Sequence, residues 1–237
     1  MLEIKSLTKT YKGTKRAVDD LSINLAPGDL CGFIGHNGAG KTTTLKCAAG
    51  ILDFEIGEIL VGGKCIRRDP LGAKRQLAFL PDEPMLYQFM TGIQFLTFIC
   101  DIYEVDNSVR QERIAKYASE LEIEFALGDL VSSYSHGMKQ KLALVSGLVR
   151  RPKLLMLDEP FVGLDPKASF ALKTLMADFC SAGGAIFFST HVLDVAEKLC
   201  NKIAIISGSK LIAAGDTDTV RGDKSLESMY LEMADNA

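Results

Sequence analysis

Tryptophan is absent from this 237-residue sequence, histidine occurs only three times, and long apolar runs are missing. A helix that crosses a membrane needs about 20 consecutive apolar residues, whereas stretches such as 185–188 and 203–206 are far shorter. Residues 1–5 also lack the apolar core of a secretory signal peptide. We therefore expect a cytoplasmic protein, and any membrane span it works with must belong to another chain.

Cysteine is present, but its spacing does not suggest pairing. The six cysteines are scattered and form no C-x-x-C pair, so neither a disulfide framework nor a metal site is indicated. We expect them to be reduced, small core residues of a cytosolic protein. They are Cys31, Cys47, Cys65, Cys100, Cys180 and Cys200.

An excess of positive charge is also lacking. The formal net charge is −3. The chain therefore lacks the strong positive electrostatic field that attracts nucleic acid, and no nucleic-acid partner is expected. Hydrophobic residues make up 47% and charged residues 24% of the chain, which is the balance of a globular domain.

The stretch 35–43 is Gly-His-Asn-Gly-Ala-Gly-Lys-Thr-Thr, and it follows the apolar run 30–34 and opens a predicted helix. It meets the pattern G-x-x-x-x-G-K-S/T in a strand–loop–helix setting. Its glycines remove β-carbons, so that backbone N–H groups and the helix N-terminus can bind phosphate. Lys41 adds a positive charge near the β- and γ-phosphates, and the Thr42 hydroxyl is placed to ligate Mg²⁺. A glycine-rich turn that binds nothing is the alternative, and the complete pattern disfavours it.

Short apolar runs predict two kinds of sheet. Residues 2–4 and 17–25 alternate as antiparallel strands with one buried face, and residues 58–66 indicate a hairpin around Gly62-Gly63. Later runs alternate with helical patterns, which is typical of a mostly parallel sheet covered by helices. The runs that predict this sheet are 30–34, 77–80, 153–158, 185–189, 202–207 and 210–214.

Residues 91–150 have the apolar spacing of helices and no strand pattern. Ser108 and Gln111 fit a capping box that opens a helix ending near Glu120, and a second helix is predicted from about residue 137 to 150. The predicted fold class is therefore α/β. It combines a P-loop NTPase core and a mostly parallel sheet with an N-terminal antiparallel β subdomain and an inserted helical lobe. In this single domain, the core comprises residues 1–90 and 151–237, and the lobe comprises residues 91–150.

Acidic residues end one of the predicted parallel strands. In open α/β sheets, ligands bind at the carboxyl ends of the strands, and Asp158-Glu159 closes such a strand. If this strand neighbours the P-loop strand, Asp158 reaches Mg²⁺ near Thr42, directly or through water. Glu159 then projects toward the γ-phosphate, where it can orient and deprotonate an attacking water. Taken alone, an Asp-Glu-Pro triplet that merely ends a strand is an equally good interpretation.

Two further stretches have weaker signals of their own. Residues 135–140, Ser-His-Gly-Met-Lys-Gln, lie at a predicted helix start, where a hydroxyl, a bare glycine N–H and the helix dipole can bind an anion. His191 follows the strand 185–189 and can hydrogen-bond a γ-phosphate. An ordinary helix cap and a structural histidine are the alternatives. His36 and His136 are interpreted as local residues of their loops rather than as catalysts.

In this order, the motifs resemble those of the ATP-binding subunit of an ABC transporter over nearly the whole chain. Residues 35–43 resemble the Walker A motif, and 154–159 resemble Walker B with its catalytic glutamate. Residues 135–138 resemble the family signature, 163–165 resemble the D-loop, and His191 resembles the switch histidine. The resemblance implies an ATPase with ATP and Mg²⁺ as its cofactors.

The resemblance also implies roles for individual residues. ATP is held by Tyr11, which stacks on adenine, and by Gly35, His36, Asn37, Gly38, Ala39, Gly40, Lys41, Thr42 and Thr43. Catalysis falls to Glu159, His191 and Lys41, and the metal ligands are Thr42, Asp158 and Asp82. The signature residues that meet the ATP of a partner subunit are Ser135, His136, Gly137 and Met138. The D-loop residues are Gly163, Leu164 and Asp165.

Several positions depart from the family pattern. Asp82 stands where a glutamine is usual, which shortens the side chain and adds a negative charge near the metal. His136 and Met138 depart from the commonest signature, Leu-Ser-Gly-Gly-Gln, and Val162 replaces a frequent D-loop serine. The acidic residue after Pro81 and this form of signature resemble the branch that exports drugs, peptides or antibiotics.

The resemblance implies an assembly at the membrane. Two ATPase subunits, identical or different, pair about a two-fold axis with two nucleotides between them, and they dock on an integral membrane permease at the cytoplasmic face. The expected dock lies beside residues 82–91 and a helix that carries Phe95, Phe98 and Tyr103. Aromatics at helical spacing are more often core than interface, so both interpretations remain open for them.

Two other functions compete with the transporter subunit. One is a soluble ABC ATPase of DNA repair or translation, but such relatives usually carry coiled coils, zinc motifs or two cassettes, and this chain has one cassette and no paired cysteines. The other is an unrelated P-loop kinase, which does not need the signature, Glu159 and His191 together.

Overall fold

The strands of this protein form two sheets, one antiparallel and one mostly parallel, as predicted. The computed structural model describes residues 1–11 and 15–235. The four-stranded sheet has the order β2-β1-β4-β5, and its neighbouring strands are antiparallel. Its strands are β1 (Leu2–Thr10), β2 (Arg16–Leu25), β4 (Ile56–Val61) and β5 (Lys64–Cys65).

The six-stranded sheet has the order β10-β9-β3-β8-β7-β6, and all its pairings are parallel except that of β9 with β10. Its central strands β3, β7 and β8 are buried along their whole length, which explains their continuous apolar sequence. Its strands are β3 (Leu30–Ile34), β6 (Leu77–Leu80), β7 (Leu154–Asp158), β8 (Ala185–Thr190), β9 (Lys202–Ser207) and β10 (Lys210–Asp216).

Two apolar cores lie on the two faces of the six-stranded sheet. Leu155 and Phe188 belong to the core that includes the helical segment 92–148, whereas Met156 and Phe187 belong to the core shared with the four-stranded sheet. Alternate side chains of a strand point to opposite faces, so each central strand contributes to both cores. The sheet is therefore held between two apolar layers.

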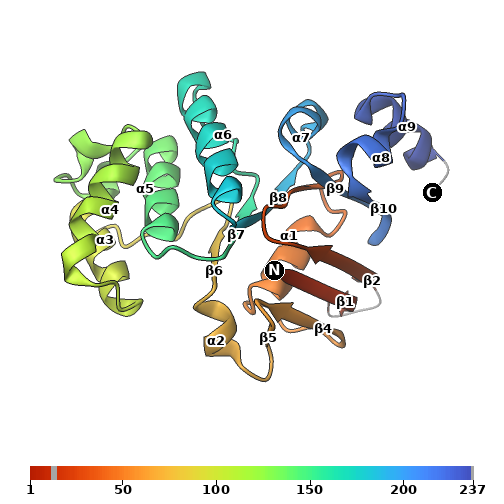
Figure 1. Cartoon of the computed structure of the whole chain (residues 1–237), viewed down its shortest axis with the longest axis horizontal. Helices are drawn as coiled ribbons and strands as arrows, with labels where there is room; N and C mark the ends of the chain where they lie inside the picture. Colours follow the sequence, from red (N-terminus) through yellow and green to blue (C-terminus); the bar gives the residue numbers. More distant parts are fainter. Residues whose placement is uncertain (12–14, 236–237) are drawn as a thin grey trace.

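The helices are distributed unevenly around the sheets (Figure 1). Helices α3, α4 and α5 gather at one end of the molecule, and α8 and α9 lie at the other end. Among the described residues, no helix has the length and apolar character needed to cross a membrane. The helices are α1 (Lys41–Ala48), α2 (Pro70–Lys74), α3 (Gly92–Ile102), α4 (Asn107–Glu120), α5 (His136–Leu148), α6 (Pro166–Ser181), α7 (Leu193–Leu199), α8 (Thr217–Arg221) and α9 (Leu226–Asp235).

The capping box predicted at Ser108 and Gln111 is wrong. Helix α4 already begins at Asn107, and its N-cap is Asp106, whose carboxylate accepts the Ser108 N–H at 2.8 Å. Ser108 is therefore inside the first turn and cannot cap it. A capping box does exist at α3, where Thr91 and Gln94 each accept the other's backbone N–H.

Candidate active site

The loop 35–40 connects β3 to α1, as predicted, and two of its glycines are required by close packing. A β-carbon built on Gly35 would lie 2.5 Å from the carbonyl oxygen of Ile206. One built on Gly40, which has φ +115°, would overlap the carbonyl of Ala17. Both positions therefore exclude larger residues, and the loop backbone stays close to the start of α1.

Lys41 lies at the first position of α1 and is only 6% exposed. Its Nζ donates to the carbonyl of Gly35 at 2.6 Å and to that of His36 at 3.4 Å. Nζ also lies 3.5 Å from Oε1 of Glu159. The ammonium group is thus fixed between the loop and the acidic end of β7, where an anionic ligand of the loop would meet it.

Asp158 ends β7, but its strand is not the direct neighbour of β3 that the sequence analysis considered. Strand β8 lies between them and contributes Ser189, whose Oγ donates to Oδ1 of Asp158 at 2.5 Å. Burial raises the pKa of Asp158, while hydrogen bonding from Ser189 and Thr42 opposes that rise. Strand β8 therefore supplies the hydroxyl that supports this carboxylate.

Glu159 and His191 form a pair at the carboxyl ends of β7 and β8. Nδ1 of His191 lies 3.0 Å from Oε2 of Glu159, and the backbone N–H of Glu159 donates to Oγ of Ser189 at 2.9 Å. Glu159 has φ +47°, a conformation that costs a non-glycine residue free energy and is common at functional sites. The carboxylate is thereby held between Lys41 and His191.

These elements surround a cavity of about 530 Å³ at the loop. Tyr11 lies at its edge, 49% exposed, with its hydroxyl 3.3 Å from Oγ1 of Thr43. An exposed ring at this place can stack on a planar group. The predicted residues that line the cavity are Tyr11, His36, Asn37, Gly38, Gly40, Lys41, Thr42, Thr43, Asp82 and Glu159.

The structure does not bring every predicted residue to this cavity. Ala39 is buried. Asp158 and His191 are not part of the cavity lining, but Asp158 accepts a hydrogen bond from Ser189 and His191 contacts Glu159, which does line the cavity. Residues 135–138 and 163–165 lie outside the lining that the described residues form. Ser135 instead caps α5, and its Oγ accepts the Met138 N–H at 3.3 Å.

Three residues near the cavity were missed in the sequence analysis. Lys15 and Ala17 line the cavity, and Ser189 joins Asp158 to the backbone of Glu159. Ser189 carries a sequence signal that could have found it, because it is a polar residue that directly follows the apolar run 185–188. Lys15 and Ala17 have no such signal, since only the pairing of β2 places them here.

The residues at the end of β7 fit a magnesium ion. Oδ2 of Asp158 is buried and has no hydrogen-bond partner among the described residues, although Thr42 and Asp82 are both near enough to affect the pKa of Asp158. An oxygen set of this kind suits Mg²⁺, which commonly takes one or two carboxylates together with substrate phosphates and water. Thr42, Asp158 and Asp82 are thus the residues that would hold the ion.

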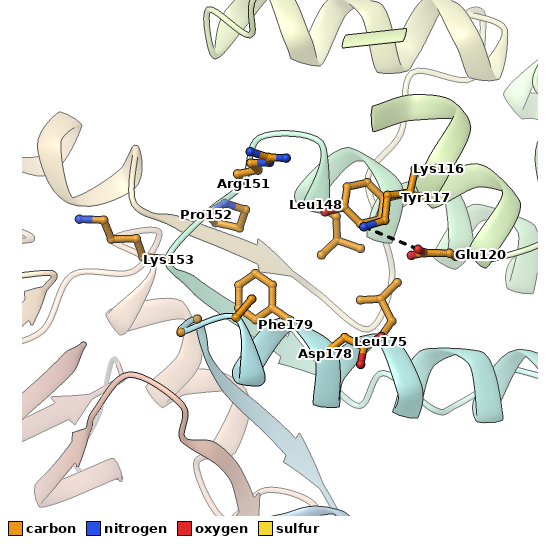
Figure 2. A pocket seen from close by; sticks show the side chains of 13 residues that line it. Lys116, Tyr117, Glu120, Leu148, Arg151, Pro152, Lys153, Leu175, Asp178 and Phe179 are labelled. Carbon is orange, nitrogen blue, oxygen red and sulfur yellow. Dashed lines mark ion pairs between the residues drawn. The ribbon is translucent and has the colours of Figure 1, made fainter. Parts of the chain in front are cut away.

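A second cavity, of about 440 Å³, lies at the amino ends of β7 and β8, opposite the carboxyl ends where the P-loop cavity lies (Figure 2). Tyr117 of α4 and Phe179 of α6 lie on two sides of it, and Lys116 and Glu120 form an ion pair at 3.8 Å. Lys153 directly precedes β7, so this cavity is separated from Asp158 by the length of that strand. Its lining differs entirely from the residues predicted to bind nucleotide.

Comparison with known proteins gives matches over most of the chain. The sequence profile of the family described as ABC transporter matches residues 18–162. The ABC-type transporter ATP-binding protein EcsA of Bacillus subtilis (strain 168) is 33% identical, with 98% of this chain and 96% of that protein covered. The linearmycin resistance ATP-binding protein LnrL of the same organism is 30% identical, with 91% and 69% covered. A solved structure of an ATP binding subunit of an ABC transporter has a TM-score of 0.94 and 32% identity, with 98% and 99% covered.

Proposed function

This chain belongs to the ABC transporter family as an ATP-binding subunit, and from that premise we propose that it drives export through a separate membrane permease. The family's activity is ATP hydrolysis with Mg²⁺. The observation that carries the ATPase part of the proposal is the position of Glu159, which lies between Lys41 and His191 beside the P-loop cavity.

The proposed chemistry assigns one task to each side chain. Lys41 and the loop N–H groups bind the phosphates. When bound, Mg²⁺ neutralises the charge that develops on the phosphate oxygens. Glu159 accepts a proton from the attacking water, and His191 orients the Glu159 carboxylate and hydrogen-bonds the γ-phosphate. Asp158, supported by Ser189, holds its position beside Thr42.

We further propose that two such subunits act as a two-fold dimer. Ser135 caps a helix in the segment 92–148 and lies outside the cavity of its own chain. An anion-binding helix start that faces no nucleotide of its own is suited to the nucleotide of a second subunit. The division into a core and a lobe at residues 91 and 150 belongs to the same proposal, because the lobe would carry this contact.

The proposed permease dock is the surface around Met85, Tyr87 and Phe89, which are 95%, 46% and 75% exposed. Exposed apolar side chains that gather in one place are typical of protein interfaces. Phe95 is buried in the core and Tyr103 stacks under the Arg150 guanidinium, so the core interpretation holds for these two aromatics. The subunit is then peripheral at the cytoplasmic face of the membrane.

Export of drugs, peptides or antibiotics is the finer part of the proposal. It is supported by the signature and Asp82 departures in the sequence and by the similarity to a protein named for linearmycin resistance. The cargo contacts would lie on the permease.

The first test replaces Glu159 by Gln, which removes the base but keeps the size of the side chain. We expect the variant to bind ATP, to lose hydrolysis by about 10²–10⁴-fold, and to accumulate as an ATP-bound dimer. Light scattering after size-exclusion chromatography with Mg-ATP measures the mass. The matched control is Glu112→Gln on the exposed face of α4. A Glu159→Gln variant that stays monomeric at saturating Mg-ATP would contradict the dimer.

A further inference from the structure

The signature segment (residues 135–138) and the D-loop (residues 163–165) touch each other within this single chain. The contact is made by the His136 ring and the Gly163 backbone. A β-carbon built on Gly163 would lie 2.5 Å from Cδ2 and 3.1 Å from Nε2 of His136. Because real β-carbon contacts are not this short, the ring occupies the space that any side chain at residue 163 would need.

The contact is reciprocal. A β-carbon built on Gly137 would lie 3.1 Å from the carbonyl oxygen of Gly163, so the backbone of the D-loop also lies close against the first turn of α5. Gly163 has φ +79°, a conformation that glycine adopts readily and other residues do not. Two glycines and one imidazole ring therefore form an interlocked contact between α5 and the D-loop.

Other contacts of α5 extend this junction back to the acidic end of β7. Gln140 is buried and borders, with Asp158 and Pro160, a small space beside β7. The positive charge of Lys141 helps to lower the pKa of Asp165, after the larger effect of the Ala168 N–H. The first two turns of α5 thus follow the stretch 158–165 along its length.

The same stretch contains Glu159, which contacts Lys41 and His191. Only three residues of chain separate Glu159 from Gly163, and Gly163 contacts His136 of the signature segment. A displacement of Glu159 can therefore reach the signature segment through this contact. Packed interfaces of this kind transmit small displacements because they resist continuous deformation.

We propose that His136 is a positioning residue that couples the signature segment to the D-loop, so that the Glu159 site and the signature segment move together. The inference rests on the proposed function, in which the signature segment serves the nucleotide of the partner subunit. Each chain then links its own hydrolytic site to the site it completes on its partner, which makes the two sites cooperative.

A double-mutant cycle tests the contact. Gly163→Ala introduces the clash with His136, and we expect kcat to fall about 10-fold or more with the KM for ATP changed less than about 3-fold, because the P-loop is intact. His136→Gly removes the ring, and we expect kcat to fall about 3–10-fold and the Hill coefficient for ATP to approach 1. In His136→Gly/Gly163→Ala the clash is gone and only the backbone strain of the alanine remains, so kcat should lie well above the product of the two single losses.

The chain supplies a matched control for the backbone strain. Gly63 has φ +78°, and no described atom beyond its chain neighbours lies within 4 Å of a β-carbon built there. Gly63→Ala therefore introduces the same backbone conformation without a ring, and it should leave kcat unchanged with or without His136→Gly. His136→Phe keeps a planar ring and should retain the Hill coefficient of the unmodified chain.

Two results would overturn the inference. One is a double variant whose kcat equals the product of the two single losses, because the residues would then act independently. The other is coupling in thermal unfolding of the nucleotide-free chain without coupling in kcat, which would reduce the contact to packing. The Glu159→Gln experiment separates this outcome from failure of the proposed function, since a dimer that forms with Mg-ATP while the cycle stays additive contradicts only the inference.

Discussion

At the scale of single residues, Ser189 shows how one buried hydroxyl can hold two neighbouring site residues in place. Its Oγ donates to Asp158 and accepts the N–H of Glu159, and the side chain is fully buried. Mutation of a residue that orients a metal ligand typically lowers metal affinity by about 10–100-fold. We predict that Ser189→Ala raises the Mg²⁺ concentration for half-maximal ATPase activity by about 10-fold, with most of kcat recovered at saturating Mg²⁺.

The measurement is ATPase rate against Mg²⁺ concentration at fixed total ATP. Ser181→Ala, at the exposed end of α6, is the control and should leave the curve in place. An unchanged Mg²⁺ dependence in Ser189→Ala would show that Asp158 does not need this hydroxyl.

The same residue shows what sequence patterns do and do not specify. The glycines and Lys41 of the loop were predictable, because phosphate binding demands these residue types at a fixed spacing. The polar end of the run 185–188 marks Ser189 as a candidate, but its link to Asp158 and Glu159 could not be predicted, because it depends on β8 lying between β3 and β7. Strand order is decided by packing between distant segments, and no local pattern records it.

At the scale of elements, periodicity predicted the existence of the strands and of several helices, while β1 extends beyond the predicted residues 2–4 and the start of α4 was misplaced. Ser108 matched a capping pattern, but Asp106 two residues earlier competes for the same N–H groups and is the better cap. Strand β7 was predicted in full, because the apolar run between Pro152 and Pro160 is too short for a buried helix. The residue at which a helix or strand begins depends on single hydrogen bonds, whereas the presence of the helix or strand depends on many residues and is easier to predict.

One such hydrogen-bonded junction ties the end of β1 to the segment before β4. Oε1 of Glu55 lies 2.9 Å from Nζ of Lys9, and Oε2 accepts the Thr10 N–H at 2.7 Å. The Lys9 hydrogen bond, and then that of Thr10, lowers the pKa of Glu55, and the same pair raises the pKa of Lys9. Both shifts favour the charged pair in the folded protein.

A lowered carboxyl pKa contributes stability above the unfolded pKa, about 4.3 for glutamate, and this contribution is lost as the pH falls through the folded value. We predict that Glu55→Gln lowers the free energy of unfolding by at most about 1 kcal/mol at pH 7, because the Glu55 side chain is 45% exposed and its charge is screened by solvent. The difference should shrink as the pH is lowered from about 5 toward 3. Urea unfolding at several pH values measures it.

The control is Glu3→Gln, because the Glu3 carboxylate, 41% exposed near the start of β1, pairs with Lys5 at 3.1 Å. It should change stability by less than Glu55→Gln at pH 7. A Glu55→Gln difference that stays constant down to pH 3 would mean that packing of the side chain, and not its charge, accounts for the loss.

At the scale of the whole molecule, the P-loop cavity and the helices α3–α5 occupy different parts of the structure. The P-loop cavity lies where the two sheets meet, and the helices α3–α5 lie to one side of it (Figure 1). The motif order predicted this general plan, since the P-loop, the pair Asp158-Glu159 and His191 each lie at the carboxyl end of a strand of the same sheet. The contact between His136 and Gly163 could not be predicted, because it depends on how closely α5 approaches a loop 27 residues further along the chain.

The exposed apolar surface around Phe89 leads to the last prediction, which concerns the membrane partner. Phe89 is 75% exposed, so replacing it by aspartate removes little packing within the chain. A charge placed in an apolar interface must be desolvated when the partner binds, which weakens association. We therefore expect Phe89→Asp to lose recovery of a polytopic membrane protein in a tagged pull-down from gently solubilised membranes, while the ATPase rate of the isolated chain is unchanged.

Phe170 on α6 is the matched control, because it is a phenylalanine of nearly equal exposure, 72%, on a different element. Phe170→Asp should recover the partner at the level of the unmodified chain. Equal recovery with Phe89→Asp would place the dock on another surface. If the unmodified chain recovers only soluble proteins, ribosomes or DNA, the ATPase serves a soluble ABC function and the exposed surface around Phe89 binds something other than a permease.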